Sequence, residues 1–171
     1  MTGKIIPASF IFAKKYSLKK LLFFFFMLVT GLGCRQLDVF EQLHAFPSHT
    51  WAASDSCRFT FRITDTAARY HLYAIIRHED AYHYNNIWLE VTTQAPSDTL
   101  KKQSVMLTLG DNKKGWLGSG MDDVFDHRVR ITRFPVQLQQ GEYTFVMKQI
   151  MREDPLQAVI QAGLRVEKVV P

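Results

Sequence analysis

The stretch Cys57-Arg-Phe-Thr-Phe-Arg-Ile63 decides the fold class of this chain. Its odd positions are apolar and its even positions are polar. Side chains along a strand point alternately to the two faces of a sheet, so this pattern predicts a half-buried β-strand. Cys57 holds one of the apolar positions, and we interpret it as a small core residue rather than a reactive thiol.

The same period of two recurs along the chain. Turn residues such as Pro96 and Pro135 separate the alternating segments, and no helical period of useful length follows residue 34. The sequence therefore predicts an all-β fold, a single antiparallel β-sandwich of about seven or eight strands. We expect strands at 57–63, 70–77, 87–93, 100–109, 129–134, 142–151 and 159–166, with a short one at Trp116–Leu117 in the Gly-rich stretch 110–120.

Residues 1–33 have the pattern of a bacterial lipoprotein signal peptide. Five lysines, four of them within residues 14–20, precede an apolar run, residues 21–32, which ends just before Cys34. The run is too short to span a bilayer, which takes about 20 residues. We expect cleavage before Cys34 and acyl chains, palmitate among them, on its sulfur. Gly31 stands where Leu, Val or Ile is usual in such signals, so an ordinary secretory signal is the alternative.

Cleavage at Cys34 would change the charge of the chain. Five of the 21 Lys and Arg residues precede Cys34, and none of the 16 Asp and Glu residues do. The remainder has no net charge, so the basic composition does not indicate nucleic-acid binding. Residues 34–54 lack a clear period, and we expect them to form a lipidated N-terminus and tether. The sandwich domain is expected at 55–171, a size that buries a core without disulfides.

Two catalytic motifs are approached but incomplete. His78 and His83 are five residues apart, whereas the zinc-protease motif needs histidines four apart on a helix. We interpret this segment as a polar hairpin tip with surface histidines. Ser119 has Leu117 and Met121 at the positions where a nucleophile elbow has glycines. We therefore expect no enzymatic activity, no catalytic residue and no cofactor.

An acidic cluster is the remaining candidate for ion binding. It consists of Asp122, Asp123 and Asp126, next to His127. Carboxylates in a loop can hold Ca²⁺, but this spacing matches no EF-hand. Arg128 and Arg130 are near enough to pair with the carboxylates. We interpret the cluster as a capped, salt-bridged turn without a metal, with ion binding as the alternative.

Three tryptophans, Trp51, Trp88 and Trp116, raise the alternative of glycan binding, in which exposed aromatic faces stack on sugar rings. Trp88 alternates with Ile87 and Leu89, so either Trp88 or its neighbours face the core, and periodicity does not decide which. Packing inside the protein is the default interpretation of a tryptophan. A surface glycan-binding lipoprotein is the alternative function.

Three blocks of sequence carry a family resemblance. They are Lys114-Gly-Trp-Leu-Gly-Ser-Gly-Met-Asp-Asp-Val-Phe-Asp-His-Arg128, then Met151-Arg-Glu-Asp-Pro-Leu156 running on to residues 162–168, and more weakly 85–93. In order and spacing these blocks resemble the GldH gliding-motility lipoproteins of Bacteroidetes. The resemblance implies a β-rich lipoprotein linked to the gliding apparatus and the type IX secretion system. It assigns a role to one residue, lipid attachment at Cys34.

The resemblance also implies a location and partners. We expect a lipid anchor in the cell envelope, at the outer membrane, with contacts to other gliding or secretion proteins and none to nucleic acid. In the first block, which we call the signature block, the three glycines Gly115, Gly118 and Gly120 favour a loop with unusual backbone angles. We expect a contact surface or structural loop at Trp116, Leu117, Gly118, Ser119, Gly120, Asp126 and Arg128.

Overall fold

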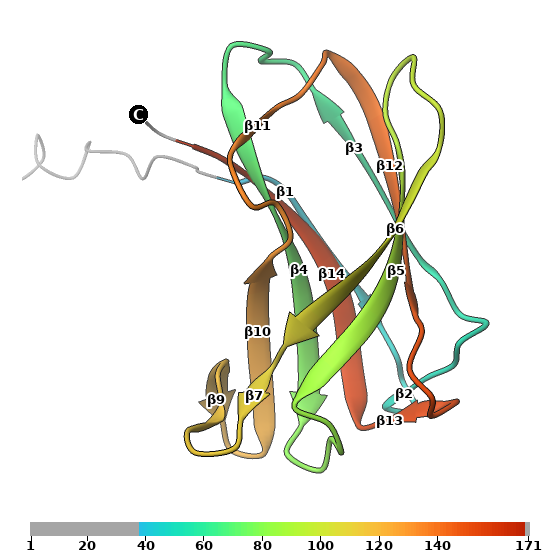
Figure 1. The fold of residues 1–171 in the computed structure, drawn as a ribbon, viewed down its shortest axis with the longest axis vertical. Coiled ribbons are helices and arrows are strands. Elements are labelled where there is room, and N and C mark those ends of the chain that lie inside the picture. The colour runs from blue at the N-terminus through green and yellow to red at the C-terminus, as the bar shows by residue number, and fades with distance from the viewer. Residues whose placement is uncertain (1–37, 170–171) are drawn as a thin grey trace, which may run out of the picture. The chain divides into compact units, whose positions relative to one another are not determined.

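The chain folds into two antiparallel sheets packed face to face. The structure, a computed structural model, describes residues 38–169, and no helix occurs among them. Figure 1 shows the two layers crossing at an angle. The fold is therefore the all-β antiparallel sandwich that the sequence predicts.

Each sheet is named here after its central strand. The β4 sheet contains β1 (Asp38–Ala45), β14 (Val159–Lys168), β4 (Arg69–Glu79), β10 (Val124–Arg130) and β9 (Ser119–Met121) in that order, and β11 (Val136–Gln137) also pairs with β4. The β12 sheet contains β3 (Cys57–Ile63), β12 (Gly141–Gln149), β5 (Asn86–Gln94) and β6 (Lys101–Thr108). Two small ladders pair β2 (Thr50–Trp51) with β13 (Leu156–Gln157), and β7 (Gly110–Asp111) with β8 (Gly115–Trp116).

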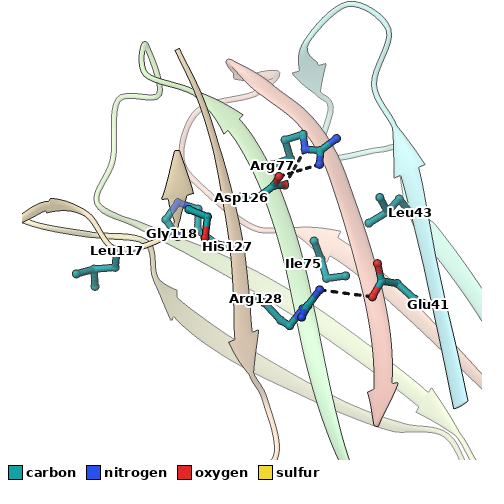
Figure 2. A pocket seen from close by; sticks show the side chains of 10 residues that line it. Glu41, Leu43, Ile75, Arg77, Leu117, Gly118, Asp126, His127 and Arg128 are labelled. Atoms are coloured by element: carbon teal, nitrogen blue, oxygen red, sulfur yellow. Dashed lines mark hydrogen bonds and ion pairs between the residues drawn. The ribbon is translucent and has the colours of Figure 1, made fainter. Parts of the chain in front are cut away.

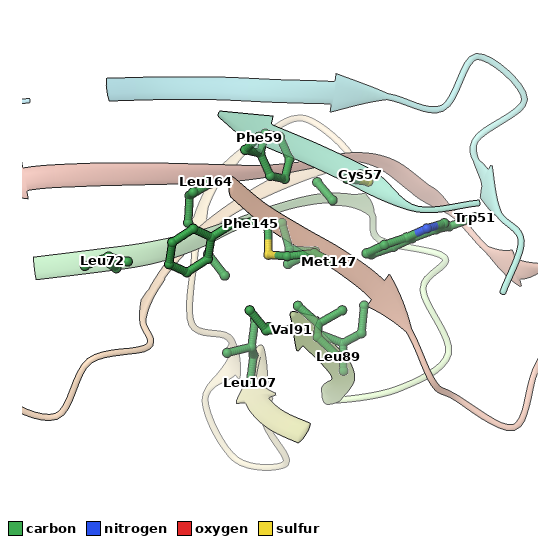
Figure 3. Packing of buried hydrophobic residues seen from close by; sticks show 14 of the residues in the cluster. Trp51, Cys57, Phe59, Leu72, Leu89, Val91, Leu107, Phe145, Met147 and Leu164 are labelled. Atoms are coloured by element: carbon green, nitrogen blue, oxygen red, sulfur yellow. The ribbon is translucent and has the colours of Figure 1, made fainter. Parts of the chain in front are cut away.

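The core fills the space between the sheets, as Figure 3 shows. Along β3 the burial alternates strictly, with every odd position from Cys57 to Ile63 buried, so the predicted phase is confirmed. Strands β12 and β5 add Met147 and Leu89 from the same sheet, and Leu164 faces them from β14. Cys57 is fully buried, and this burial raises its pKa to about 12.

The structure places the first strand of the sandwich earlier than the sequence indicates. Strand β1 lies inside residues 34–54, the segment expected to be a tether, and it pairs with β14 from Asp38 to Ala45. The alternation of β1 is hidden because its side chains are mostly exposed. The ring of Phe40 still packs on Phe61, with centroids 5.4 Å apart.

Two further differences concern strand number and position. The described residues contain 14 strands, more than the seven or eight expected, because six of them are short strands of two or three residues: β2, β7, β8, β9, β11 and β13. The strand expected at 129–134 instead runs from Val124 to Arg130, so the end of the signature block is strand rather than turn. No helix of the described part of the chain is long and apolar enough to cross a membrane.

Candidate functional site

The signature block comes together on the outer face of the β4 sheet. A pocket of about 480 Å³ opens there, and Figure 2 shows its lining. Five of the seven residues that the sequence singled out contribute to it: Leu117, Gly118, Ser119, Asp126 and Arg128. The other lining residues, Glu41, Leu43, Ile75, Arg77 and His127, come from β1, β4 and β10.

Strand register sets the central ion pair of this pocket. In the β4–β10 ladder Asp126 lies opposite Arg77, and the two side chains make two hydrogen bonds of 2.7 Å each. The sequence places Arg128 and Arg130 near the carboxylates of the acidic cluster, but the partner of Asp126 is Arg77 of the neighbouring strand. Residues two apart on one strand are about 6.6 Å apart along it, whereas directly opposite residues have Cβ atoms about 5 Å apart.

A second charged group forms the wall near β1. Glu41 accepts a hydrogen bond from Arg165 of β14, and Arg128 of β10 lies 3.7 Å from the same carboxylate. Arg165 also donates to Glu167. One carboxylate thus lies between two guanidinium groups, and the half-exposed Arg128 faces the pocket, as Figure 2 shows.

The floor of the pocket is apolar although it lies on the outer face. Ile75 is only 7% exposed there, because Leu43 reaches across β14 towards it. Gly163 makes this approach possible, since a Cβ atom at that position would lie 2.4 Å from Leu43 Cδ2. The pocket therefore combines an apolar floor with charged walls.

The glycines of the signature block act mainly through close packing. Only Gly115 has a positive φ, of 75°, so the expectation of unusual backbone angles is correct for one glycine of three. At Gly118 a Cβ atom would lie 2.3 Å from the carbonyl oxygen of Asp126, and at Gly120 it would lie 2.7 Å from Phe125. The block therefore lies tightly against β10, which no larger residue at 118 would permit without a shift.

A buried pair of histidines lies behind the pocket. His78 and His127 are 0% and 2% exposed, and their Nε2 atoms are 2.9 Å apart. His78 Nδ1 lies 2.7 Å from the carbonyl oxygen of Glu79, which can only accept a hydrogen bond. Nδ1 of His78 therefore carries the proton, and His127 donates from its Nε2 to that of His78. Burial lowers both pKa values, that of His127 to about 4, with His78 as a further cause there.

Trp116 covers this histidine pair. Its ring packs edge-on against His78 with centroids 4.4 Å apart, and its indole N–H donates to Asp80 over 2.6 Å. The interpretation of His78 as a surface residue is wrong, while His83 is exposed as expected. A signal for His78 was present in the sequence, because it continues the even phase of Leu72, Ala74 and Ile76.

The remaining candidates are dispersed. Asp122 and Asp123 are exposed in the turn between β9 and β10, where Asp122 has a φ of 54°. Between residues 38 and 169 no group of three His, Cys, Asp or Glu side chains is placed to hold a metal ion. Ser119 makes no side-chain hydrogen bond to a histidine or a carboxylate in that range. Cys34 lies outside the described residues.

The tryptophans have three different environments. Trp51 is fully buried and stacks on Phe46 with centroids 5.0 Å apart, while Trp88 is 42% exposed on the outer face of the β12 sheet. Trp116 is half-buried over the histidine pair. The open question about Trp88 is thus resolved: its neighbours Ile87 and Leu89 face the core.

Comparison with known proteins adds a family. A family model described as GldH lipoprotein matches residues 38–166. A Christiangramia forsetii protein named gliding motility lipoprotein GldH homolog is 22% identical over 152 residues, covering 85% of this chain and 93% of that one. Gliding motility lipoprotein GldH of Flavobacterium johnsoniae is 22% identical over 143 residues, covering 80% and 88%.

Among solved structures, the crystal structure of a carbohydrate-binding module specific for non-crystalline cellulose aligns with a TM-score of 0.39 and 7% identity. The alignment covers 80% of this chain and 75% of that chain. A similarity this low supports no argument about what this chain binds.

Proposed function

Because this chain belongs to the GldH lipoprotein family, we propose that it acts without catalysis as a component or accessory of the gliding-motility and type IX secretion machinery. As a family member it is a lipid-anchored cell-envelope protein. Acyl chains on Cys34 supply the anchor in this proposal, and the outer membrane is its site. One acyl chain gives only marginal, reversible membrane binding, whereas two or more make the attachment stable.

One observation supports the proposal of action through protein contacts: residues 117–121 of the signature block are mostly exposed and lie beside charged side chains of β4 and β10. Leu117 and Met121 are 52% and 79% exposed beside the Arg77–Asp126 pair. Arginine and methionine are enriched in protein–protein interfaces, and exposed apolar side chains beside fixed charges suit a protein partner. We name this surface, Leu117 to Met121 with Arg77, Asp126 and Arg128, the signature surface.

The test compares a variant of the signature surface with a matched variant elsewhere. Arg128→Glu, combined with Leu117→Asp, reverses one charge and adds another at exposed positions. The control is Arg58→Glu with Met106→Asp, two exposed positions on the β12 sheet. Each pair would replace the chromosomal gene in the native host. We expect loss of surface spreading or protein export with the first pair and normal behaviour with the control.

A photocrosslinking residue at position 117 would identify the partner in intact cells. The same residue at position 58 is the control. The proposal is wrong if deletion of the whole gene leaves both spreading and export normal. A normal deletion strain together with a measured enzymatic turnover would replace it with a catalytic role.

A second candidate function rests on Trp88. This exposed tryptophan lies between Met106, its cross-strand partner, and Ile150, whose backbone N–H donates to the Trp88 carbonyl over 3.0 Å. An exposed ring on a sheet face can stack on a sugar ring. Titration of the protein with soluble envelope and plant polysaccharides, followed by tryptophan fluorescence, tests this role. Binding that Trp88→Ala abolishes would support it, and the absence of binding would reject it.

A further inference from the structure

We propose that one end of the sandwich rests on the lipid surface and that the signature surface consequently points away from it. The end in question, here the β1-start end, consists of the loops 64–68, 95–100 and 131–135 and the first residues of β1. This inference rests on the proposed lipid attachment at Cys34. It adds an interaction surface, made of named side chains, to the acyl anchor.

Only a short length of chain separates the proposed anchor from the folded domain. Because β1 begins at Asp38, only residues 35–37 separate the folded domain from Cys34. A fully extended chain spans at most about 3.6 Å per residue, so Cys34 and Asp38 are no more than about 14 Å apart. Strand β4 has 11 residues, which corresponds to about 36 Å at 3.3 Å per residue. The distance that the linker allows between the anchor and the start of β1 is therefore shorter than the domain is long.

The strand register brings three loops to the same end of the sandwich. Asp38 pairs with Glu167, and Lys168 pairs with Tyr70, so β1 and β4 start at one end of the sheet. Val136 also pairs with Tyr70, which places loop 131–135 near that end. In the other sheet Gly141 pairs with Ile63 and Lys101 with Thr93, and the β3–β4 connection joins the sheets there. Figure 1 shows the loops after β3 and β5 at its upper end, while the connection from β10 to β11 begins lower, alongside β4.

Two of these loops carry large apolar side chains that are exposed. Phe134 is 68% exposed and Leu100 is 65% exposed, although both lie in loops, which usually carry polar residues at their tips. Within residues 38–169 most of the surface of both side chains is open to solvent. Aromatic and aliphatic residues of this kind enter the boundary between headgroups and acyl chains when a protein is held at a membrane surface.

Positive charge lies beside these apolar side chains. Arg133 lies over the Phe134 ring, 5.4 Å from its centroid, and Arg69 is exposed in the same region. Neither arginine forms an ion pair within residues 38–169, so both can meet lipid phosphates. The loops of the β1-start end also hold Asp65 and Asp98, but these carboxylates pair with Lys168 and Lys101. In the loops of the opposite end, carboxylates outnumber the three basic residues Lys113, Lys114 and Arg152; they are Asp55, Asp80, Asp122, Asp123, Glu153 and Asp154. An anionic surface therefore favours the β1-start end.

Contact of the β1-start end with the lipid would orient the signature surface relative to the membrane. Residues 116–121 and the start of β10 lie at the far end of β4, where Val124 pairs with Glu79. With the β1-start end on the lipid, this surface is presented away from the anchoring membrane. A partner would then approach from the side opposite the lipid.

The experiment uses the acylated protein purified from its own membranes and placed in vesicles of phosphatidylglycerol and phosphatidylethanolamine. Single cysteines at Gln140, near the β1-start end, or Lys113, near the far end, carry a fluorophore; both positions are exposed. The buried Cys57 will not compete for the label. With nitroxide-bearing lipids we expect quenching of the Gln140 label and none of the Lys113 label.

A second pair of variants tests the side chains themselves. Phe134→Ser with Leu100→Ser should reduce the quenching at Gln140, whereas Met121→Ser, which removes an exposed apolar side chain at the far end, should not. Equal quenching at both labels, or stronger quenching at Lys113, overturns the orientation while the acyl anchor stands. Mass spectrometry that finds an unacylated N-terminus overturns the anchor of the proposed function, and the orientation with it.

Discussion

At the scale of single residues, the histidine pair shows how the interior constrains protonation. His78 already donates from Nδ1 to the Glu79 carbonyl, so a proton on its Nε2 would face the Nε2–H of His127. Only one of the two facing Nε2 atoms can carry a proton in the observed geometry, so the two rings cannot both be charged. Burial is the first cause of the lowered pKa values of both groups.

A pH-dependent loss of stability follows from this pair. The pKa of His127 falls from 6.5 to about 4 on folding, so between these values the unfolded chain binds a proton that the folded chain does not. Stability is unaffected by this group above pH 6.5 and decreases as the pH falls towards 4, by up to about 3 kcal/mol. Urea unfolding at a series of pH values should show the decrease, and His127→Gln should flatten it. An unchanged slope in the variant would contradict the assignment.

Gly118 offers a second test at this scale. Gly118→Ala would place a methyl group 2.3 Å from the Asp126 carbonyl oxygen, and backbone cannot yield as a flexible side chain can. We expect a loss of about 1–3 kcal/mol in the free energy of unfolding. Gly115→Asn is the control, because no atom lies within 4 Å of a Cβ atom there and asparagine tolerates positive φ. Equal effects of the two substitutions would show that close packing at 118 is not the constraint.

At the scale of elements, β1 is the strand whose role the sequence conceals. It adds an edge to the β4 sheet, and its partners run from Glu167 to Gln161 of β14. Its alternation is weak because a single residue, Phe40, packs inward among mostly exposed neighbours. Strands β3 and β12 could be recognised, although β3 is also an edge strand, since one face of each is buried and imposes the apolar period.

Truncation tests the place of β1 in the domain. A chain of residues 46–171 loses the β1–β14 ladder and the Phe40–Phe61 contact. We expect its free energy of unfolding to fall by at least about 3 kcal/mol, comparable with removal of a large core side chain. A chain of residues 36–171 is the control and should melt cooperatively. Circular dichroism on heating measures both, and equal melting temperatures would restore the tether interpretation.

At the scale of the whole molecule, the two sheets enclose a single core with Cys57 inside it. This thiol is fully buried, and burial raises its pKa to about 12. Access to Cys57 therefore requires opening of the sandwich rather than motion of a side chain.

Thiol labelling measures that opening. In protein with Cys34→Ser, we expect Cys57 to resist an aromatic disulfide reagent at pH 8 and to become reactive in urea in parallel with loss of β-structure. A Thr60→Cys variant of the same strand, whose side chain faces outward, should react at once. Rapid labelling of Cys57 in the native protein would indicate an opening that leaves most of the sandwich intact.

The sequence by itself determined the all-β fold, the phase of β3, the burial of Cys57 and the family. Each of these depends on local alternation or on contiguous blocks of residues, which can be read along the chain. Only the tertiary structure decided that Asp126 pairs with Arg77, that His78 meets His127, and that the signature block surrounds one pocket with Glu41 and Leu43. These pairs are separated by 49 residues or more. Strand register between distant segments fixes them, and no local pattern encodes that register.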